Sequence, residues 1–256
     1  SNHIRALALV TAALTVALPA AAQAQLPQLF VASDQCLACH NGLVAPSGMD
    51  VSISSDWRAS MMAHSSRDPY WQASVKRETM VHPSASAAIE HECAACHMPM
   101  TRYMAKVAGQ KWSVFDHLPV NAQRSPEGLL AVDGVSCAMC HQITAEKLGE
   151  KASFTAGFAL DTSTPLGERL AFGPFEVTEG RKTLMRSASQ FLPEKADHVQ
   201  SSELCATCHT LYTHALDEEG NVVGELPEQV PYLEWKHSDY RDSRSCQSCH
   251  MPVVEE

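Results

Sequence analysis

The chain has 256 residues, of which 45% are hydrophobic and 19% charged, and its formal net charge at pH 7 is −10. Such an acidic balance argues against a nucleic-acid partner and favours basic partners, although a solvated surface without a specific partner has the same composition. Fourteen prolines and twelve glycines are spread along the chain, which is typical of short helices and loops.

The first 24 residues are typical of a secretory signal peptide. Arg5 is a short positive region, Ala6 to Leu18 is uncharged and apolar, and Ala22-Gln-Ala24 offers a cleavage site between small residues. An uncleaved membrane anchor is the alternative, which a short, Ala-rich run disfavours. We therefore predict a signal peptide over residues 1–24. The remaining residues, 25–256, would then be an exported domain, periplasmic or extracellular, without stable membrane insertion.

Five copies of Cys-x-x-Cys-His use every cysteine of the chain. In order, and called motifs 1 to 5, they are Cys36-Leu-Ala-Cys39-His40, Cys93-Ala-Ala-Cys96-His97, Cys137-Ala-Met-Cys140-His141, Cys205-Ala-Thr-Cys208-His209 and Cys246-Gln-Ser-Cys249-His250. This spacing is typical of c-type haem, whose vinyl groups are bonded by the two thiols and whose iron is bound by the adjacent histidine. We predict five covalently attached haems c, held by the ten cysteines and the five histidines.

Two other uses of paired cysteines were weighed. Structural zinc takes two such pairs for each ion, so an odd number of motifs does not suit it, and zinc does not need a histidine after every second cysteine. Cysteines two residues apart that bridge each other are more typical of redox sites than of structural disulfides. Both readings are therefore disfavoured.

Several helices are predicted in chain order. Ser54 or Ser55 begins a helix that carries Trp57, Met61 and His64. Asp68-Pro69 begins a second helix, with proline at its first position and with Trp71 and Val75 on one face. A third runs from Ser84 to Ala95 into motif 2, and Ser201 or Ser202 begins a short helix that carries Cys205.

The segment between His141 and His198 has a different pattern. Glycines and prolines interrupt short apolar runs, which predicts a loop-rich insertion with one hairpin. Residues 217–221, Asp-Glu-Glu-Gly-Asn, predict a turn. The chain ends six residues after His250, which suggests a missing C-terminal region. The predicted fold class is mainly α with extensive loops and little β, its short helices wrapped around a stacked multihaem core.

Histidines outside the motifs are candidates for the second axial ligands. There are eight, and His3 falls within the predicted signal peptide, so seven remain for five irons: His64, His82, His91, His117, His198, His214 and His237. His64 and His198 are the preferred ligands, followed by His117 and His237. His91 lies two residues before Cys93, so it suits a neighbouring haem. Methionines such as Met62, Met80 and Met104 are rival ligands, but packing against porphyrin edges is their more usual role.

One weak internal similarity links two segments. Asp-Trp-Arg-Ala-Ser at 56–60 is similar to Glu-Trp-Lys-His-Ser at 234–238, and each segment follows a haem motif. His64 stands seven residues after Trp57, whereas Asp242 stands seven residues after Trp235. The similarity indicates related haem-packing helices or arises by chance.

These motifs resemble the tetrahaem cytochrome c family that accepts electrons from hydroxylamine oxidoreductase. The resemblance covers about residues 34–210 and rests on Trp57, Ser60 and His64 after motif 1, on Gly134-Val-Ser136 before motif 3, and on Glu203-Leu204 before motif 4. It implies a helical, loop-rich shell around stacked haem pairs. It also implies ligation by two histidines at most irons, the option of one five-coordinate iron, and His64 as a distal ligand. Motif 5 and the long insertion depart from that family.

Two functions follow from this pattern. The leading prediction is an electron-transfer protein, because irons bound by two histidines are saturated and change oxidation state without substrate chemistry. Its partners would be redox proteins, basic ones or other multihaem cytochromes. The alternative is an enzyme that reduces or oxidises small nitrogen or sulfur oxyanions at one open iron.

Overall fold

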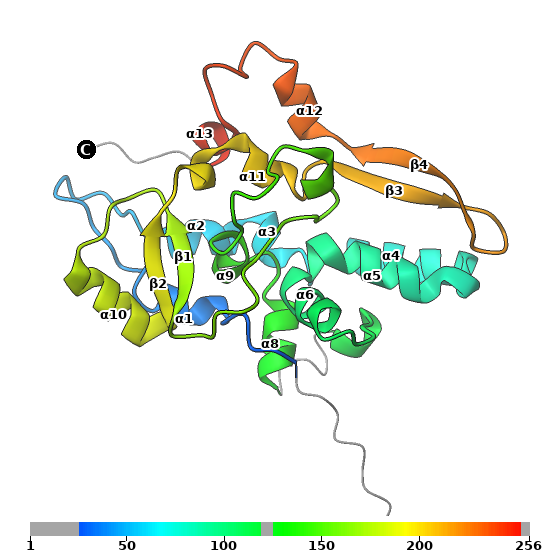
Figure 1. The fold of residues 1–256 in the computed structure, drawn as a ribbon, viewed down its shortest axis with the longest axis horizontal. Coiled ribbons are helices and arrows are strands. Elements are labelled where there is room, and N and C mark those ends of the chain that lie inside the picture. Colours follow the sequence, from blue (N-terminus) through cyan, green and yellow to red (C-terminus); the bar gives the residue numbers. More distant parts are fainter. Residues whose placement is uncertain (1–25, 119–124, 252–256) are drawn as a thin grey trace, which may run out of the picture.

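A computed structural model describes residues 26–118 and 125–251, and the predicted signal peptide lies outside these described residues. Short helices joined by long loops dominate the described part, together with two small two-stranded sheets (Figure 1). The predicted mainly helical, loop-rich class is therefore confirmed. In the part that the structure describes, no helix is both long and apolar enough to cross a membrane.

The helices of the first half follow one another closely along the chain. They are α1 (Ser33–Leu37), α2 (Ile53–Ala59), α3 (Met61–His64), α4 (Pro69–Val81), α5 (Ser86–His97), α6 (Pro99–Val107), α8 (Pro126–Val132) and α9 (Cys137–Cys140), with single 3-10 turns at η1 (Pro83–Ala85) and η2 (Phe115–His117). α4 and α5 lie side by side, and α6 connects them to α8 (Figure 1).

One predicted helix start is confirmed by a capping hydrogen bond, and a second lies two residues from its predicted place. Asp68 precedes α4 and its carboxylate accepts the amide of Tyr70 at 2.9 Å, while Pro69 takes the first helical position. Trp71 and Val75 are buried, as their shared face predicted. The helix expected from Ser84 begins at Ser86, after the turn η1, and runs into motif 2.

The helix expected to carry both Trp57 and His64 is interrupted. α2 ends before Ser60, which has an extended backbone, and α3 begins after it. The Ser60 hydroxyl donates to the carbonyl of Trp57 at 2.7 Å and accepts the amide of Ala63 at 3.3 Å. One side chain therefore ends the first helix and caps the second, because a serine bonds main-chain groups that a continuous helix would use.

The expected hairpin between His141 and His198 is wrong. β1 (Arg169–Gly173) and β2 (Phe191–Lys195) pair in parallel, from Arg169 with Phe191 to Gly173 with Lys195, and α10 (Glu179–Ser189) connects them. A parallel pair needs such a crossover. The insertion also contains the 3-10 turns η3 (Lys151–Ser153) and η4 (Asp197–Gln200).

The last part of the chain holds a hairpin and two attachment helices. After α11 (Ser202–Ala206), which begins where the sequence predicted, come β3 (Leu211–Leu216), β4 (Val222–Gln229), α12 (Pro231–Lys236) and α13 (Cys246–His250). β3 and β4 are antiparallel, and Figure 1 shows them extending as a ribbon past α4 and α5. The predicted turn at residues 217–221 joins them, closed by a bond from the amide of Gly220 to the carbonyl of Asp217.

Two buried apolar clusters form the core. The first includes Phe30, Met100, Met139, Phe158 and Phe191, and cysteines of motifs 2 and 4 pack against it. The second is built around the buried tryptophan of α4 and the first cysteine of motif 2. The attachment motifs therefore lie at the boundary of the polypeptide core.

Candidate functional site

Each motif folds as about one turn of helix. The histidine amide donates to the carbonyl of the first cysteine in motifs 1, 3 and 4, at 3.0, 3.0 and 2.9 Å. Motifs 2 and 5 lie inside α5 and α13. Residues at positions i, i+3 and i+4 of a helix share one face, so the two thiols and the imidazole project together. This local geometry suits a haem attached at two points and bound through its iron.

The cysteines are not grouped as a structural zinc site would need. All ten are free of disulfide bonds, and structural zinc takes four ligands from one cluster. Among residues 26–118 and 125–251, no three His, Cys, Asp or Glu side chains are grouped so that they could hold a metal ion by themselves. An iron here would depend on porphyrin nitrogens.

Main-chain carbonyls orient two of the motif histidines. Nδ1 of His97 lies 3.0 Å from the carbonyl oxygen of Ser65, and Nδ1 of His141 lies 2.6 Å from that of Phe172. A proton shared with the carbonyl leaves Nε2 as the free lone pair, which is the arrangement found around metal-binding histidines. His97 also stacks on Trp71, with ring centroids 4.5 Å apart. α3, α4 and β1 therefore supply outer contacts to motifs 2 and 3.

Burial keeps two further motif histidines in the neutral form that binds metals. It lowers the pKa of His40, helped by the neighbouring imidazole of His141. It also lowers the pKa of His209, helped by His250. Both pairs of rings belong to motifs that lie next to each other in space.

The five motifs form one connected group through their cysteines. The thiols of Cys36 and Cys137 lie close enough to influence each other, as do those of Cys96 and Cys208 and those of Cys205 and Cys246. Cys140 interacts electrostatically with Cys208 and Cys205. In space the motifs therefore run 1–3–4–5, with motif 2 joined to motif 4.

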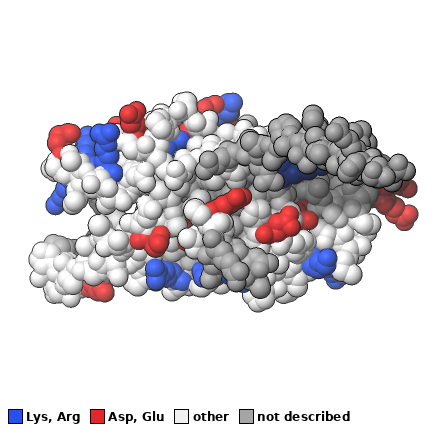
Figure 2. Space-filling model, turned by 90° about the horizontal axis from the view of Figure 1, so that it is seen from below, with Lys and Arg blue, Asp and Glu red and all other residues white. Residues whose placement is uncertain are grey.

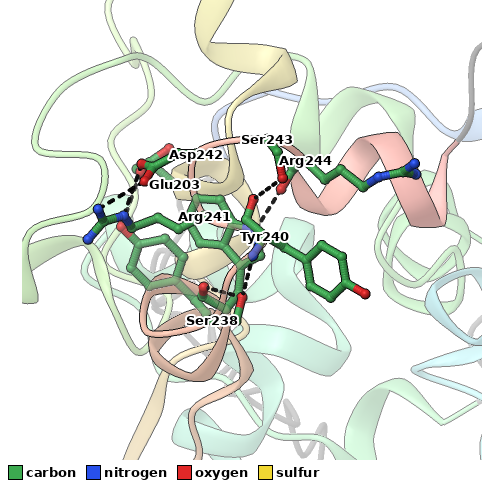
Figure 3. Close-up of polar contacts among 9 residues, drawn as sticks. Glu203, Ser238, Tyr240, Arg241, Asp242, Ser243 and Arg244 are labelled. Carbon is green, nitrogen blue, oxygen red and sulfur yellow. Dashed lines mark hydrogen bonds and ion pairs between the residues drawn. The ribbon is translucent and has the colours of Figure 1, made fainter.

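The two ends of this series are the most open. Cys39 and Cys249 are exposed, whereas the other eight cysteines are half-buried. A surface hollow of about 420 Å³ lies against motif 1, lined by residues that include Leu37, Asn41 and Arg58. Another, of about 360 Å³, is lined by residues that flank motifs 4 and 5, among them Glu203 and Arg241 (Figure 3). Solvent and partners can reach both ends.

The two preferred distal histidines lie beside different motifs. His64 is exposed at the end of α3, and the next residue, Ser65, donates its hydroxyl to the carbonyl of His97 in motif 2 at 2.9 Å. His198 lies against motif 3 instead: its Nε2 is 2.8 Å from the carbonyl oxygen of Ile143, and Phe172 meets it edge-on. Both remain predictions.

The other distal candidates have more varied surroundings. Both ring nitrogens of His117 are engaged, Nδ1 with Ser113 at 2.7 Å and Nε2 with Glu127 at 3.2 Å, so iron ligation would require release from Glu127. His237 is exposed directly after α12. His91 is half-buried in α5, and burial lowers its pKa.

Two charged residues beside the motifs were not predicted from the sequence. Asp133 accepts the amide and the hydroxyl of Ser33, at 2.8 and 2.6 Å, and so ties the segment before motif 3 to the helix of motif 1. Arg169, 2% exposed, donates to Gln142 at 2.8 Å, to the carbonyl of Thr164 at 2.8 Å and to the carbonyl of Asp161. Neither residue lies in a motif, so no spacing identified it.

The fold is similar to that of a solved multihaem protein. The penta-haem cytochrome c552 from Thermochromatium tepidum matches 89% of this chain with a TM-score of 0.53 and 17% sequence identity. The chain spans about 55% of the length of that protein. No family model and no curated protein sequence matches the chain. Over most of its length the chain therefore has a multihaem cytochrome c fold.

Proposed function

We propose that the chain is an exported pentahaem c-type cytochrome that transfers electrons, and that its ten motif cysteines hold five haems c. The single observation that carries the proposal is the contact between motifs. Five helical turns, each with two thiols and an imidazole on one face, form an unbroken series in which cysteines of successive motifs lie close together. Bound haem iron would supply reversible one-electron chemistry.

The residues of the chain would position the cofactors and adjust their potentials. The five motif histidines would be proximal ligands, two of them oriented by main-chain carbonyls. His64 and His198 are the proposed distal ligands, followed by His117, His237 and His91. The large apolar side chains that the polypeptide leaves exposed, such as Val44, Ile53 and Met61, suit an apolar cofactor core.

Export is supported by the signal-like residues 1–24 and by the cofactor, since haem c is attached outside the bacterial cytoplasm. We place the protein in the periplasm or outside the cell. Kinship with the tetrahaem family that serves hydroxylamine oxidoreductase remains our proposal, supported by Trp57, Ser60 and His64.

Basic redox proteins or other multihaem cytochromes are the proposed partners. The net charge is −10, and the carboxylates of Glu78, Glu92 and Glu228 lie near Cys93 of motif 2. Figure 2 shows charges of both signs scattered over another face of the molecule, without one dominant sign. Electrostatic attraction to a basic partner would therefore be local.

Mass spectrometry of the denatured exported protein tests the proposal directly. We expect five haem additions, and four in a control in which Cys246 and Cys249 are both replaced by serine. Electron paramagnetic resonance (EPR) of the oxidised protein should then show mainly low-spin irons. A mass without haem, or with zinc retained under native conditions, would refute the assignment; mainly high-spin iron would refute saturation by histidine.

A further inference from the structure

We propose that motifs 1 and 3 and motifs 4 and 5 are two copies of one haem-pair unit, in which Trp57 and Trp235 are equivalent positioning residues. The inference rests on the proposed function, since it concerns how the chain would hold its haems. It goes further because it assigns the same role to two side chains that no haem motif contains.

The first copy is organised around Trp57. Its indole Nε1 donates at 3.0 Å to the carbonyl of Val135, two residues before Cys137. α2, which carries the tryptophan, follows motif 1 and ends next to the segment that begins motif 3. In this copy the helices that carry the first cysteines of the two motifs, α1 and α9, are in contact.

The second copy repeats each of these contacts. Nε1 of Trp235 donates at 2.7 Å to the carbonyl of Arg244, two residues before Cys246. α12 follows motif 4 and is separated from motif 5 by the loop shown in Figure 3. The helices that carry the first cysteines, α11 and α13, are again in contact.

The helix ends and starts match as well. Ser60 and Ser238 each donate a hydroxyl to the carbonyl of their own tryptophan at 2.7 Å. α1 and α11 are both five residues long and begin with a buried serine three residues before the first cysteine. A serine also stands immediately before the first cysteine of motif 3 and of motif 5.

The match between the two copies does not arise from connections of similar length between the tryptophan and the motif that it contacts. From Trp57 to Cys137 the sequence runs 80 residues and includes motif 2, whereas from Trp235 to Cys246 it runs 11. The same hydrogen bond is therefore made across a long-range contact in one copy and across a short loop in the other. Shared geometry, rather than a shared loop, accounts for it.

The remaining two tryptophans provide an internal contrast. Nε1 of Trp71 and Nε1 of Trp112 are buried and have no hydrogen-bond partner within residues 26–118 and 125–251. An indole hydrogen bond is thus not a general property of tryptophan in this chain. It occurs at the two tryptophans that join neighbouring motifs.

Such a bond fixes how far apart two attachment helices lie. Two redox centres on these helices repel each other's charge, and the repulsion falls with distance. A looser pair would therefore take up its two electrons at more similar potentials. The role predicted for Trp57 and Trp235 is to keep each pair close.

Phenylalanine keeps the ring and removes the indole N–H, so Trp57→Phe and Trp235→Phe are the test variants. In a spectroelectrochemical titration of the haem-loaded protein, we expect each variant to narrow the separation of two of the five reduction waves, and the two variants to affect different waves. Tyr70→Phe, which removes a hydroxyl from an exposed side chain at the start of α4, is the control and should leave the five waves in place. If a tryptophan variant does not fold, Ser60→Ala and Ser238→Ala loosen the same helix ends more mildly.

Each outcome has a defined meaning. Lower melting temperatures with unchanged reduction waves would show that the two tryptophans affect stability only. That result would overturn the inference. A shift in one variant without a matching shift in the other would overturn the equivalence of the two units. Fewer than five haems in the unmodified protein would instead refute the proposed function, and haem counting by mass before the titration separates the two failures.

Discussion

The hydrogen bonds of Asp133 predict that this residue holds the first and third motifs together. Its carboxylate accepts the Ser33 amide at 2.8 Å and the Ser33 hydroxyl at 2.6 Å, and Ser33 is buried at the start of α1. The residue before α1, Ala32, has no side chain that could cap this helix. Asp133 therefore provides, from 100 residues away, the acceptor that a local cap would have provided.

The size of the expected stability loss follows from the two hydrogen bonds that Asp133 accepts. In Asp133→Ala a buried N–H and a buried O–H lose their acceptor, at about 1–3 kcal/mol each, so we expect a loss of about 3 kcal/mol of unfolding free energy. For a chain of this size that corresponds to about 6–12 °C in melting temperature. Asp133→Asn keeps one carbonyl oxygen as acceptor and removes a charge that burial disfavours, so its cost should stay below about 1 kcal/mol.

The pH dependence gives a second, independent check. Burial raises the pKa of Asp133 above its ordinary value, against the opposing effect of the Ser33 bonds. The folded state therefore binds this proton more tightly than the unfolded state, and the stability from this group is full at low pH and lost as pH rises through the folded pKa. In thermal unfolding followed by circular dichroism, the melting temperature of the wild type should rise relative to that of Asp133→Asn as pH falls from 7 towards 4. Equal losses in the Asn and Ala variants would show that the charge, and not the acceptor, matters, and refute this reasoning.

Three further predictions concern ligation and potential. Replacing His64 by Ala should convert one low-spin haem to high spin or allow it to bind carbon monoxide, and an unchanged spectrum would remove His64 from the ligands. Redox titration of the whole protein should spread over a broad range, mostly below the potentials of His/Met cytochromes; one sharp wave at high potential would contradict ligation by two histidines. Arg169→Gln should cost about 2–4 kcal/mol in denaturant unfolding because its carbonyl acceptors lose their donors. It should also lower the potential of one haem, since a buried cation favours the reduced iron, whereas Arg169→Lys should preserve that potential.

Local features of the fold were predictable because local sequence determines them. Cysteine and histidine at i, i+3 and i+4 require only one helical turn, and Asp68-Pro69 carries its own cap and its own first helical residue. The break at Ser60 was missed, because the periodicity of Trp57, Met61 and His64 is helical and the competing serine bonds are visible only in three dimensions. The parallel pairing of Arg169 with Phe191 was missed for a related reason, since the helix α10 that connects the strands is rich in polar residues and the strand partners are 22 residues apart.

The site was predictable only in its chemistry. The attachment residues follow from the motifs, but the carbonyls of Ser65 and Phe172 that orient His97 and His141 are main-chain atoms and leave no pattern in side-chain sequence. The similarity between the segments at Trp57 and Trp235 was the one sequence signal of the spatial arrangement. Its meaning emerged from the carbonyls that the two indoles reach.

In the proposed function, the spatial order of the motifs determines the route that electrons would take through the chain. Motif 4 contacts motifs 2, 3 and 5, whereas motifs 1 and 5 stand at the open ends of the series. Losing the haem of motif 5 would shorten such a conduit, but losing the haem of motif 4 would divide it. Electrons would then pass between motifs that lie far apart in sequence, as Cys36 and Cys137 do. The long insertion that carries Arg169 and Phe172 packs against motif 3, between the two proposed haem-pair units, where the buried cation would act on an electron passing from one unit to the other.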